Sequence, residues 1–410
     1  MRIMLSCGEA SGDLYAGALS AELRRRMPAV EIFGFGGQRL AAAGGQLVGH
    51  FGGLTVTGLT EALRVLPRSY AMLRRLVDVA RERRPDVFVA IDFPDFNFRL
   101  MGELRRLAIP IVYYVSPQLW AWRSGRMETM KRFVDKVLVI FPFESAIYER
   151  ARVPVEFVGH PLVDIARSTQ PRSTFLRDRG LVPDAPTVAL LPGSRPNELH
   201  RIAPGMVAAL PLIRECVPDV QFIVACAPDL PDAMFASFLG PARAGPHVKK
   251  DGGAGSTRSQ SDRQDIGAGF SRPILVHDRT DDVLAASDAV ITASGTATVQ
   301  AALHERPMTV VYKLSPLTYR LGKPFVNVDM YAMPNLVANR RVVPELIQEE
   351  FTPARVAEET VSFLTDREKH ARTREALRRV REALGAPGAS GRAADAVLEV
   401  ARRGRGVRSA

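Results

Sequence analysis

The sequence has few cysteines and no long apolar run. Its 410 residues include three cysteines, Cys7, Cys216 and Cys226, which lie far apart and form neither a CxxC pair nor a Cys/His ligand spacing. We therefore expect three buried thiols, with neither a disulfide framework nor a metal site. No segment approaches the roughly 18 consecutive apolar residues of a transmembrane helix.

The first residues, MRIMLSCGEASGD, also lack the apolar stretch and cleavage site of a signal peptide, because they lead directly into a strand and a glycine turn. We therefore expect a cytoplasmic protein. Acidic residues are in the minority, since 44 Asp and Glu face 55 Lys and Arg. The net charge of +11 favours an anionic partner: a nucleotide, a phosphorylated substrate, an acidic membrane or nucleic acid. Aromatic residues are sparse and no RNA-binding signature occurs, so nucleic acid is the least favoured.

Short apolar runs alternate with amphipathic stretches through both halves of the chain, which is βαβ patterning. The pattern predicts an α/β protein with two Rossmann-like parallel-sheet domains. The runs of the first half are RIMLS, EIFGFGG, DVFVAID, IVYYVSP and KVLVIFPF, and those of the second half are TVALLPGSR, QFIVACAP, PILVHD, DAVITASGT and MTVVYK.

The domain boundary is predicted between Arg167 and Pro186, where the sequence is polar and contains proline. We assign residues 1–170 to the first domain and 171–345 to the second, and we expect the helices of 346–410 to fold back onto the first. Residues 241–272 are rich in Gly, Ser and charge, which indicates a flexible surface insertion. A basic lid over a ligand is the alternative interpretation of this segment.

The segment SCGEASGD lies between the first predicted strand and helix. Ligands of open α/β sheets bind beyond the carboxyl ends of the strands, where helix N-termini offer free amides to phosphate. Gly8 and Gly12 would let the backbone approach a ligand, Ser11 would cap the helix, and Glu9 is a carboxylate without an obvious structural role. The spacing matches neither of the common glycine-rich phosphate motifs, so purely structural glycines remain an alternative.

Another buried strand, in DVFVAIDFPDFN, ends at two carboxylates, Asp92 and Asp95. A partly buried carboxylate with a raised pKa would suit a general base. Capping of a loop and a helix is the alternative role for both residues.

Trp120 and Trp122 follow a further strand, and His160 ends the last strand of the first half. Trp122 would line a sugar or acyl pocket, and His160 would contact a phosphate or a hydroxyl. Packing in the protein core is the alternative for all three.

In the second half, TVALLPGSRPNEL predicts a strand, a tight turn and a helix that begins at Pro196. The amides around Gly193 and Ser194 would bind an anion, and Arg195 would balance the charge of a diphosphate without a metal. A structural salt bridge is the alternative for Arg195.

The segment DAVITASGTATVQ repeats this arrangement, with Ser294, Gly295 and Thr296 at a strand-to-helix junction. Gln300 would hydrogen-bond a ribose or a uracil, or else face solvent. Asn335, in a later loop, would close over the nucleotide.

Seven segments in order resemble the motif series of the lipid-A-disaccharide synthase family and span most of the chain. They are GEASGD, IDFPDFN, YYVSPQLWAWR, GHPLVD, LLPGSRPNE, SGTAT and PNLVANR. The resemblance implies a GT-B glycosyltransferase whose second domain binds UDP, whose first domain binds the acceptor and whose transfer site lies in the cleft between them. By matching positions, Asp95 is similar to the family's catalytic carboxylate and Arg195 to its donor-diphosphate arginine. The family often has Glu where this chain has Gln300, which places the expected ribose contact in doubt.

The resemblance further implies the substrates UDP-2,3-diacylglucosamine and 2,3-diacylglucosamine 1-phosphate, with inversion to a β-1,6-linked disaccharide phosphate and no cofactor. Acylated substrates imply contact with the inner membrane of a Gram-negative bacterium, and we leave a homodimer open. An interfacial helix is predicted in LTEALRVLPRSYAMLRRLVDVARERR, although an ordinary Rossmann helix would also show an apolar face. Its membrane-contact residues would be Leu63, Val65, Leu66, Arg68, Met72, Leu73, Arg74, Arg75 and Leu76. A UDP-sugar epimerase of the same architecture, a non-catalytic nucleotide-binding protein and an RNA-binding protein are the alternative functions.

Overall fold

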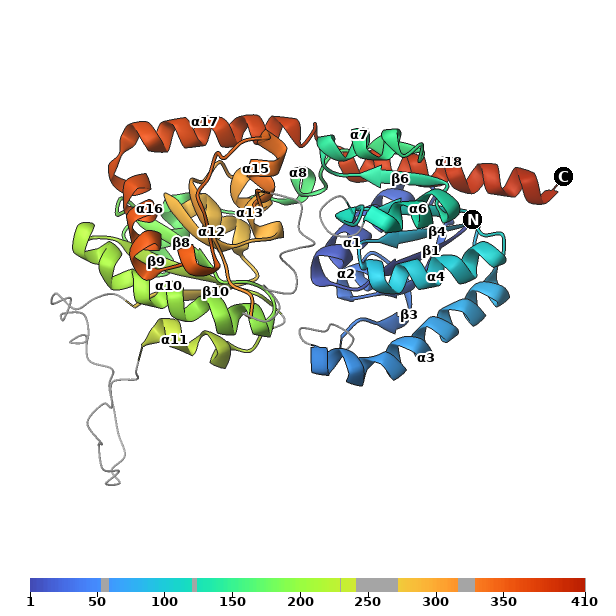
Figure 1. The fold of residues 1–410 in the computed structure, drawn as a ribbon, viewed down its shortest axis with the longest axis horizontal. Helices are drawn as coiled ribbons and strands as arrows, with labels where there is room; N and C mark the ends of the chain where they lie inside the picture. The colour runs from blue at the N-terminus through green and yellow to red at the C-terminus, as the bar shows by residue number, and fades with distance from the viewer. Residues whose placement is uncertain (53–58, 120–123, 229, 241–271, 316–328, 410) are drawn as a thin grey trace, which may run out of the picture.

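The computed structural model describes residues 1–52, 59–119, 124–228, 230–240, 272–315 and 329–409, and only the backbone for 59–65, 124 and 405–409. It contains two parallel sheets, each with helices on both sides (Figure 1). The two-domain α/β prediction is therefore confirmed. The predicted insertion at 241–272 lies outside the described residues except for Arg272.

The first sheet has the order β3-β2-β1-β4-β5-β6-β7 and is parallel throughout. Its strands are β1 (Arg2–Cys7), β2 (Glu31–Gly36), β3 (Gln46–His50), β4 (Val87–Ile91), β5 (Ile111–Tyr114), β6 (Lys136–Val139) and β7 (Val155–Phe157). The helices of this part are α1 (Ala10–Arg26), α2 (Gln38–Ala42), α3 (Leu59–Arg83), α4 (Pro94–Arg106), η1 (Ser124–Arg126), α6 (Met127–Phe133), α7 (Pro142–Arg150) and α8 (Leu162–Ile165).

The second sheet has the order β10-β9-β8-β11-β12-β13 and is also parallel. Its strands are β8 (Thr187–Leu191), β9 (Gln221–Cys226), β10 (Ile274–His277), β11 (Ala289–Ala293), β12 (Met308–Tyr312) and β13 (Glu345–Ile347). The helices that accompany it are α9 (Arg172–Arg177), α10 (Pro196–Cys216), η2 (Asp232–Phe235), α11 (Ala236–Leu239), α12 (Thr280–Ala286), α13 (Thr296–Leu303), α15 (Met333–Ala338), η5 (Gln348–Glu350), α16 (Pro353–Thr365) and α17 (Arg367–Ala383).

The central strands are apolar along their whole length because helices cover both faces of each sheet. Every residue of β4, β8 and β11 is buried, as expected for parallel sheets. In each sheet the strand order reverses between two neighbouring strands, β1 and β4 in the first and β8 and β11 in the second. Ligands of open α/β sheets bind beyond the carboxyl ends of such strands.

The C-terminal helices divide between the two sheets. α16 packs against α10, and α17 packs against α13 and α15, so both stay with the second sheet. Only α18 (Ala389–Ser409) returns to the first domain, where it lies along α1, β4 and β5 (Figure 1). The expectation that all of 346–410 would return is corrected accordingly.

Two of the three cysteines, Cys7 and Cys226, are buried as predicted. The prediction was wrong for Cys216, which is exposed because it is the last residue of α10.

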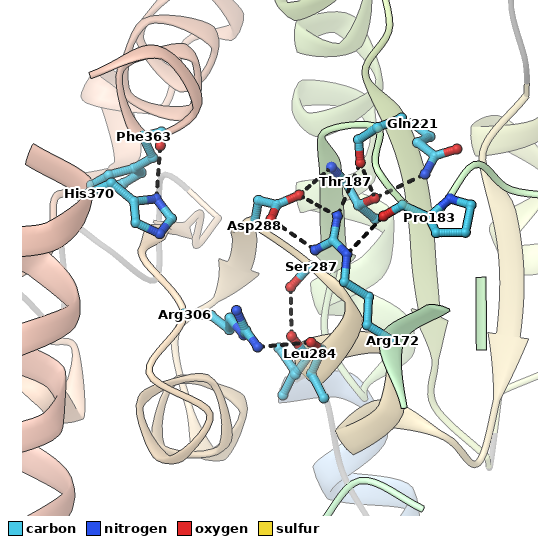
Figure 2. Close-up of polar contacts among 12 residues, drawn as sticks. Arg172, Pro183, Thr187, Gln221, Leu284, Ser287, Asp288, Arg306, Phe363 and His370 are labelled. Carbon is cyan, nitrogen blue, oxygen red and sulfur yellow. Dashed lines mark hydrogen bonds and ion pairs between the residues drawn. The ribbon is translucent and has the colours of Figure 1, made fainter. Parts of the chain in front are cut away.

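The segment before the second sheet is attached to the amino ends of its strands through Arg172. The guanidinium donates to both carboxylate oxygens of Asp288 at 2.8 Å and to the carbonyl of Pro183 at 3.1 Å (Figure 2). Asp288 also accepts from the amide of Thr187 at 2.8 Å, so one carboxylate joins the segment to the starts of β8 and β11. A surface pocket of about 320 Å³ lies beside this pair, at the sheet edge opposite the strand ends on which ligands are expected.

The two connections between the domains pack on each other through glycine. Gly159 and Gly385 have φ values of +83° and +98°, and the amide of His160 donates to the carbonyl of Leu384 at 2.8 Å. A Cβ at Gly385 would lie 3.1 Å from the Cα of Gly159. Glycine is therefore required both by the backbone conformation and by the close approach.

We predict that Gly385→Ala lowers the free energy of unfolding by about 2–4 kcal/mol, because a positive φ and a close contact both oppose a Cβ. The control is Gly180→Ala, at φ +70° with nothing within 4 Å of a Cβ, which should cost only about 1–2 kcal/mol. Urea denaturation of both variants measures the difference. Equal losses would contradict the packed double connection.

Candidate functional site

Glu9 and Asp92 lie side by side at the strand-order reversal of the first sheet. Glu9 follows β1 and is the N-cap residue of α1, and Asp92 follows β4. These strands are paired up to Cys7 and Ile91, so the residues after them share one sheet edge. The predicted cap by Ser11 is wrong, since Ser11 lies inside the first turn of α1.

The backbone around Asp92 is held in an unusual conformation. Asp92 and Phe93 have φ values of +45° and +51°, in the left-handed region that non-glycine residues seldom adopt. A Cβ at Gly8 would lie only 2.3 Å from the Phe93 ring, so glycine is needed where the two turns meet. Such strain persists where the surroundings enforce it, commonly at functional sites.

The Asp92 carboxyl has a perturbed acidity. Burial raises its pKa to about 6, and the nearby charge of Glu9 acts in the same direction. The Phe93 amide and the positive charge of Arg195 oppose the shift. The pKa lies close enough to neutrality for Asp92 to exchange a proton during a reaction.

Arg195 reaches this site from the second domain. It follows β8 as the N-cap residue of α10, after Gly193, whose φ of +119° allows the tight turn. Its guanidinium donates to Glu198 at 2.9 Å and, across the domain junction, to Glu9 at 2.5 Å. Burial disfavours the charge of Arg195, but Glu9 and Glu198 outweigh that cost and raise its pKa above the ordinary value. We call Glu9, Asp92, Arg195 and Glu198 the interdomain site.

The second turn that the sequence predicts to bind the donor follows β11, the strand next to β8. Gly295, at φ +145°, is the N-cap residue of α13, and Thr296 begins the helix after β11. Ser294 donates its hydroxyl to the carbonyl of Tyr331 at 3.3 Å. Because β8 and β11 are adjacent, these amides and those near Arg195 lie at the same sheet edge. This edge can bind an anion.

Comparison with known proteins decides the family. A model of the family described as lipid-A-disaccharide synthetase matches residues 3–240 and 269–400. The lipid-A-disaccharide synthase of Myxococcus xanthus is 41% identical over 98% of this chain and 98% of its own length. That of Geobacter metallireducens is 40% identical over 97% of each chain. The chain belongs to the lipid-A-disaccharide synthetase family.

Solved structures establish the GT-B fold. The UDP-GlcNAc 2-epimerase of Neisseria meningitidis, bound to UDP-GlcNAc, matches with a TM-score of 0.64 at 11% identity, over 97% of this chain and 100% of its own. The calicheamicin glycosyltransferase CalG4 matches with a TM-score of 0.59 at 17% identity, over 98% of both. The fold is common to epimerases and transferases, and membership of the lipid-A-disaccharide synthetase family makes this chain a glycosyltransferase.

Asp95, expected from the sequence to be the catalytic carboxylate, lies three residues after Asp92. It is exposed in the first turn of α4 and forms an ion pair with Arg126. Trp122, predicted nearby, lies outside the described residues. The structure therefore places two carboxylates of different exposure, Asp92 and Asp95, on the acceptor-side domain.

Two other predicted residues are enclosed in the protein. His160 is buried against Tyr15 and Phe141, where burial lowers its pKa to about 3, and its Nδ1 accepts from the Leu162 amide at 3.2 Å. It therefore presents no imidazole to a ligand in this arrangement.

Asn335 is likewise fully buried. Its amide group donates to Glu345 at 2.7 Å and to the carbonyl of Val343 at 2.9 Å, and its oxygen accepts from the amide of Val342 at 2.7 Å. These bonds organise the loop before β13. Gln300 is half-buried on α13, with its amide 3.5 Å from Asp281.

The predicted interfacial helix α3 has both a core face and an exposed face. Leu73 and Leu76 are buried in the first domain's core, so the prediction that they contact a membrane was wrong. The exposed face of α3 carries Arg68, Arg74 and Arg75. Leu66 is 47% exposed, and Met72 is half-buried. The side chains of Leu63 and Val65 lie outside the described residues. Tyr70, which sequence reasoning missed, is 55% exposed beside Leu66.

Among the described residues, no cluster of three or more His, Cys, Asp or Glu is arranged to hold a metal ion. Within the same residues, no helix is long and apolar enough to cross a membrane.

We predict that Asp92→Asn stabilises the protein at pH 8. Because the folded-state pKa of Asp92 lies above its ordinary value of 3.8, the folded state binds this proton more tightly than the unfolded chain. The associated stability is present below about pH 4 and is lost as the pH rises through about 6. Removing the charge should therefore raise the unfolding free energy at pH 8 by about 1–3 kcal/mol, with little change at pH 4.

Urea denaturation at both pH values checks this. Asp78→Asn, which removes an exposed carboxylate on α3, is the control and should change stability by less than about 0.5 kcal/mol at either pH. Parallel behaviour of the wild type and Asp92→Asn across this range would show that the Asp92 carboxyl is not perturbed.

Proposed function

We propose that this protein is a lipid-A-disaccharide synthase acting at the interdomain site. It transfers 2,3-diacylglucosamine from UDP-2,3-diacylglucosamine to 2,3-diacylglucosamine 1-phosphate, giving the β-1,6-linked disaccharide 1-phosphate and UDP. The observation that carries the proposal is the identity of about 40% to relatives of that name over nearly the whole of both chains.

The donor side of the proposed mechanism belongs to the second domain. The diphosphate binds Arg195 and the amides that follow β8 and β11, near Gly193, Ser194 and Ser294. As the bond from the anomeric carbon to the diphosphate oxygen breaks, its electron pair stays on UDP. Arg195 stabilises that negative charge without needing a metal.

The acceptor side belongs to the first domain. The acceptor's 6-hydroxyl attacks the anomeric carbon from the face opposite the leaving UDP, which inverts the configuration. Asp95 takes the hydroxyl proton, because it is exposed in the first turn of α4, three residues after Asp92. Asp92 is the alternative base, supported by its pKa near 6.

The proposal is tested by mass spectrometry of the products formed from the two acylated substrates. A disaccharide monophosphate that requires both substrates supports it. Conversion of the UDP-sugar without the acceptor would instead identify a UDP-sugar epimerase, a class that shares the fold. UDP binding without any product would indicate a nucleotide-binding protein.

We predict that Asp95→Asn lowers kcat by about 10²–10⁴-fold and leaves the Kd for UDP within about twofold of wild type, because a general base acts on the acceptor alone. Glu103→Gln, farther along α4, is the control and should retain activity. Turnover assays and calorimetry with UDP make the comparison. A near-normal rate for Asp95→Asn would move the base to Asp92 or Glu9.

The proposed location is the cytoplasmic face of the inner membrane of a Gram-negative bacterium. Acyl chains keep the substrates in the bilayer, so the enzyme must work at its surface. The exposed pair Leu66 and Tyr70 on α3, next to Arg68, Arg74 and Arg75, combines apolar side chains with cations that suit an anionic interface.

We predict that Leu66→Asp combined with Tyr70→Asp weakens binding to anionic phospholipid vesicles by about tenfold or more, through lost apolar insertion and charge repulsion. The control is Val182→Asp, which replaces a 59% exposed apolar residue of the second domain. Vesicle flotation measures binding. Equal binding by the double variant and the wild type would place the membrane contact elsewhere.

A further inference from the structure

Both terminal nitrogens of Arg195 are already held by carboxylates. One donates to Glu198 at 2.9 Å and the other to Glu9 at 2.5 Å. A diphosphate would use the same nitrogens, because the forked geometry of a guanidinium suits two oxygens of an anion. The ion pairs and the proposed ligand therefore compete for one group.

The local charge makes this competition strong. Two carboxylates around one guanidinium leave a net charge of about −1, and Asp92 lies close enough for its pKa to respond to both Glu9 and Arg195. A diphosphate brings further negative charge into a partly buried site. Like charges in such a site repel strongly unless one carboxylate moves away.

Glu198 is tied to the binding site itself. It lies on the same helix, three residues after Arg195, and its carboxylate is 2.9 Å from where a Cβ of Gly193 would stand. It therefore moves together with Arg195 and the turn that would bind the anion.

Glu9 belongs to the other domain and is the carboxylate that can leave. It is the N-cap residue of α1, yet its side chain makes no capping hydrogen bond. Among the described residues, Arg195 is the one hydrogen-bond or ion-pair partner of its carboxylate. Either a side-chain rotation or a small domain movement would separate the pair.

We propose that Glu9 competes with the donor diphosphate for Arg195 and is displaced when the donor binds. This inference rests on the proposed function, since it assumes a UDP-linked donor at Arg195. Before the donor binds, the Glu9 carboxylate is paired with Arg195 of the second domain. After the donor binds, the freed carboxylate lies on the first domain beside Asp92. Donor binding is thereby coupled to the contact between the two domains.

The test is isothermal titration calorimetry, which measures the Kd of the full-length protein for UDP. Glu9→Gln removes the competing charge and should lower the Kd for UDP by about three- to tenfold at low salt, with a smaller gain at about 0.5 M salt. Glu22→Gln is the matched control. Glu22 is 30% exposed, against 31% for Glu9, and pairs with Arg25 and Arg26 far along α1. This control should bind UDP as the wild type does.

A second variant guards against a folding defect in Glu9→Gln. Glu9→Asp keeps the charge but withdraws it by about 1.5 Å, one carbon–carbon bond, so its affinity for UDP should lie between those of wild type and Glu9→Gln. Weaker UDP binding by Glu9→Gln would show that Glu9 orients Arg195 for the donor, and would overturn the proposal.

Unchanged UDP affinity with a raised KM for the acceptor would make Glu9 an acceptor contact, and would also overturn it. A wild-type protein that binds no UDP would remove the proposed function and this inference together. A wild type that binds UDP while Glu9→Gln shows no gain removes the inference alone.

Discussion

An arginine of one domain lies between two carboxylates, one from each domain, and the organisation of the molecule follows from that contact. Parallel strands bring their carboxyl ends and the following helix N-termini to one edge of a sheet. Here two such edges face each other, and Arg195 joins them through Glu9. The junction between the domains is therefore held by the group that is best suited to bind a phosphate.

The remaining features of the first domain keep this junction in place. The left-handed backbone at Asp92 and Phe93 turns β4 into α4, and Gly8 leaves room for the Phe93 ring. At the other end, glycines 159 and 385 bring the two interdomain connections into contact. The fold thus combines a tight double connection with an ion pair that an anion can break, which is an arrangement suited to domain movement on binding.

Much of the fold was predictable from the sequence, because buried parallel strands are short apolar runs and crossover helices have a helical period. The positions of Glu9, Asp92, Arg195 and Thr296 after their strands followed from the same pattern. The ion pair between Glu9 and Arg195 did not, since the residues are 186 positions apart and no local pattern joins them. Burial of His160 also depends on a distant segment, since its ring packs on Tyr15. Asn335 is buried by hydrogen bonds to Val343 and Glu345 just ahead in the chain, which the polar character of its loop did not indicate.

The packing of the C-terminal helices and of α3 also could not be predicted from the sequence. Their amphipathic periods predict helices, but which surface each helix covers is decided by tertiary packing. α17 stays on the second sheet, and Leu73 and Leu76 face the core, whereas Leu66 and Tyr70 face outward.

Asp13, in the motif GEASGD, also has a role that the sequence did not predict. It accepts hydrogen bonds from the amides of Gly37 and Arg39 and so has a structural role that its motif did not indicate.

The most direct test of the account is a crystal structure of the protein with UDP bound. We expect a diphosphate oxygen within hydrogen-bond distance of the Arg195 guanidinium, close to the amides that follow β8 and β11, and a Glu9 carboxylate that no longer contacts Arg195. A diphosphate bound elsewhere, with the Glu9–Arg195 ion pair intact, would contradict it.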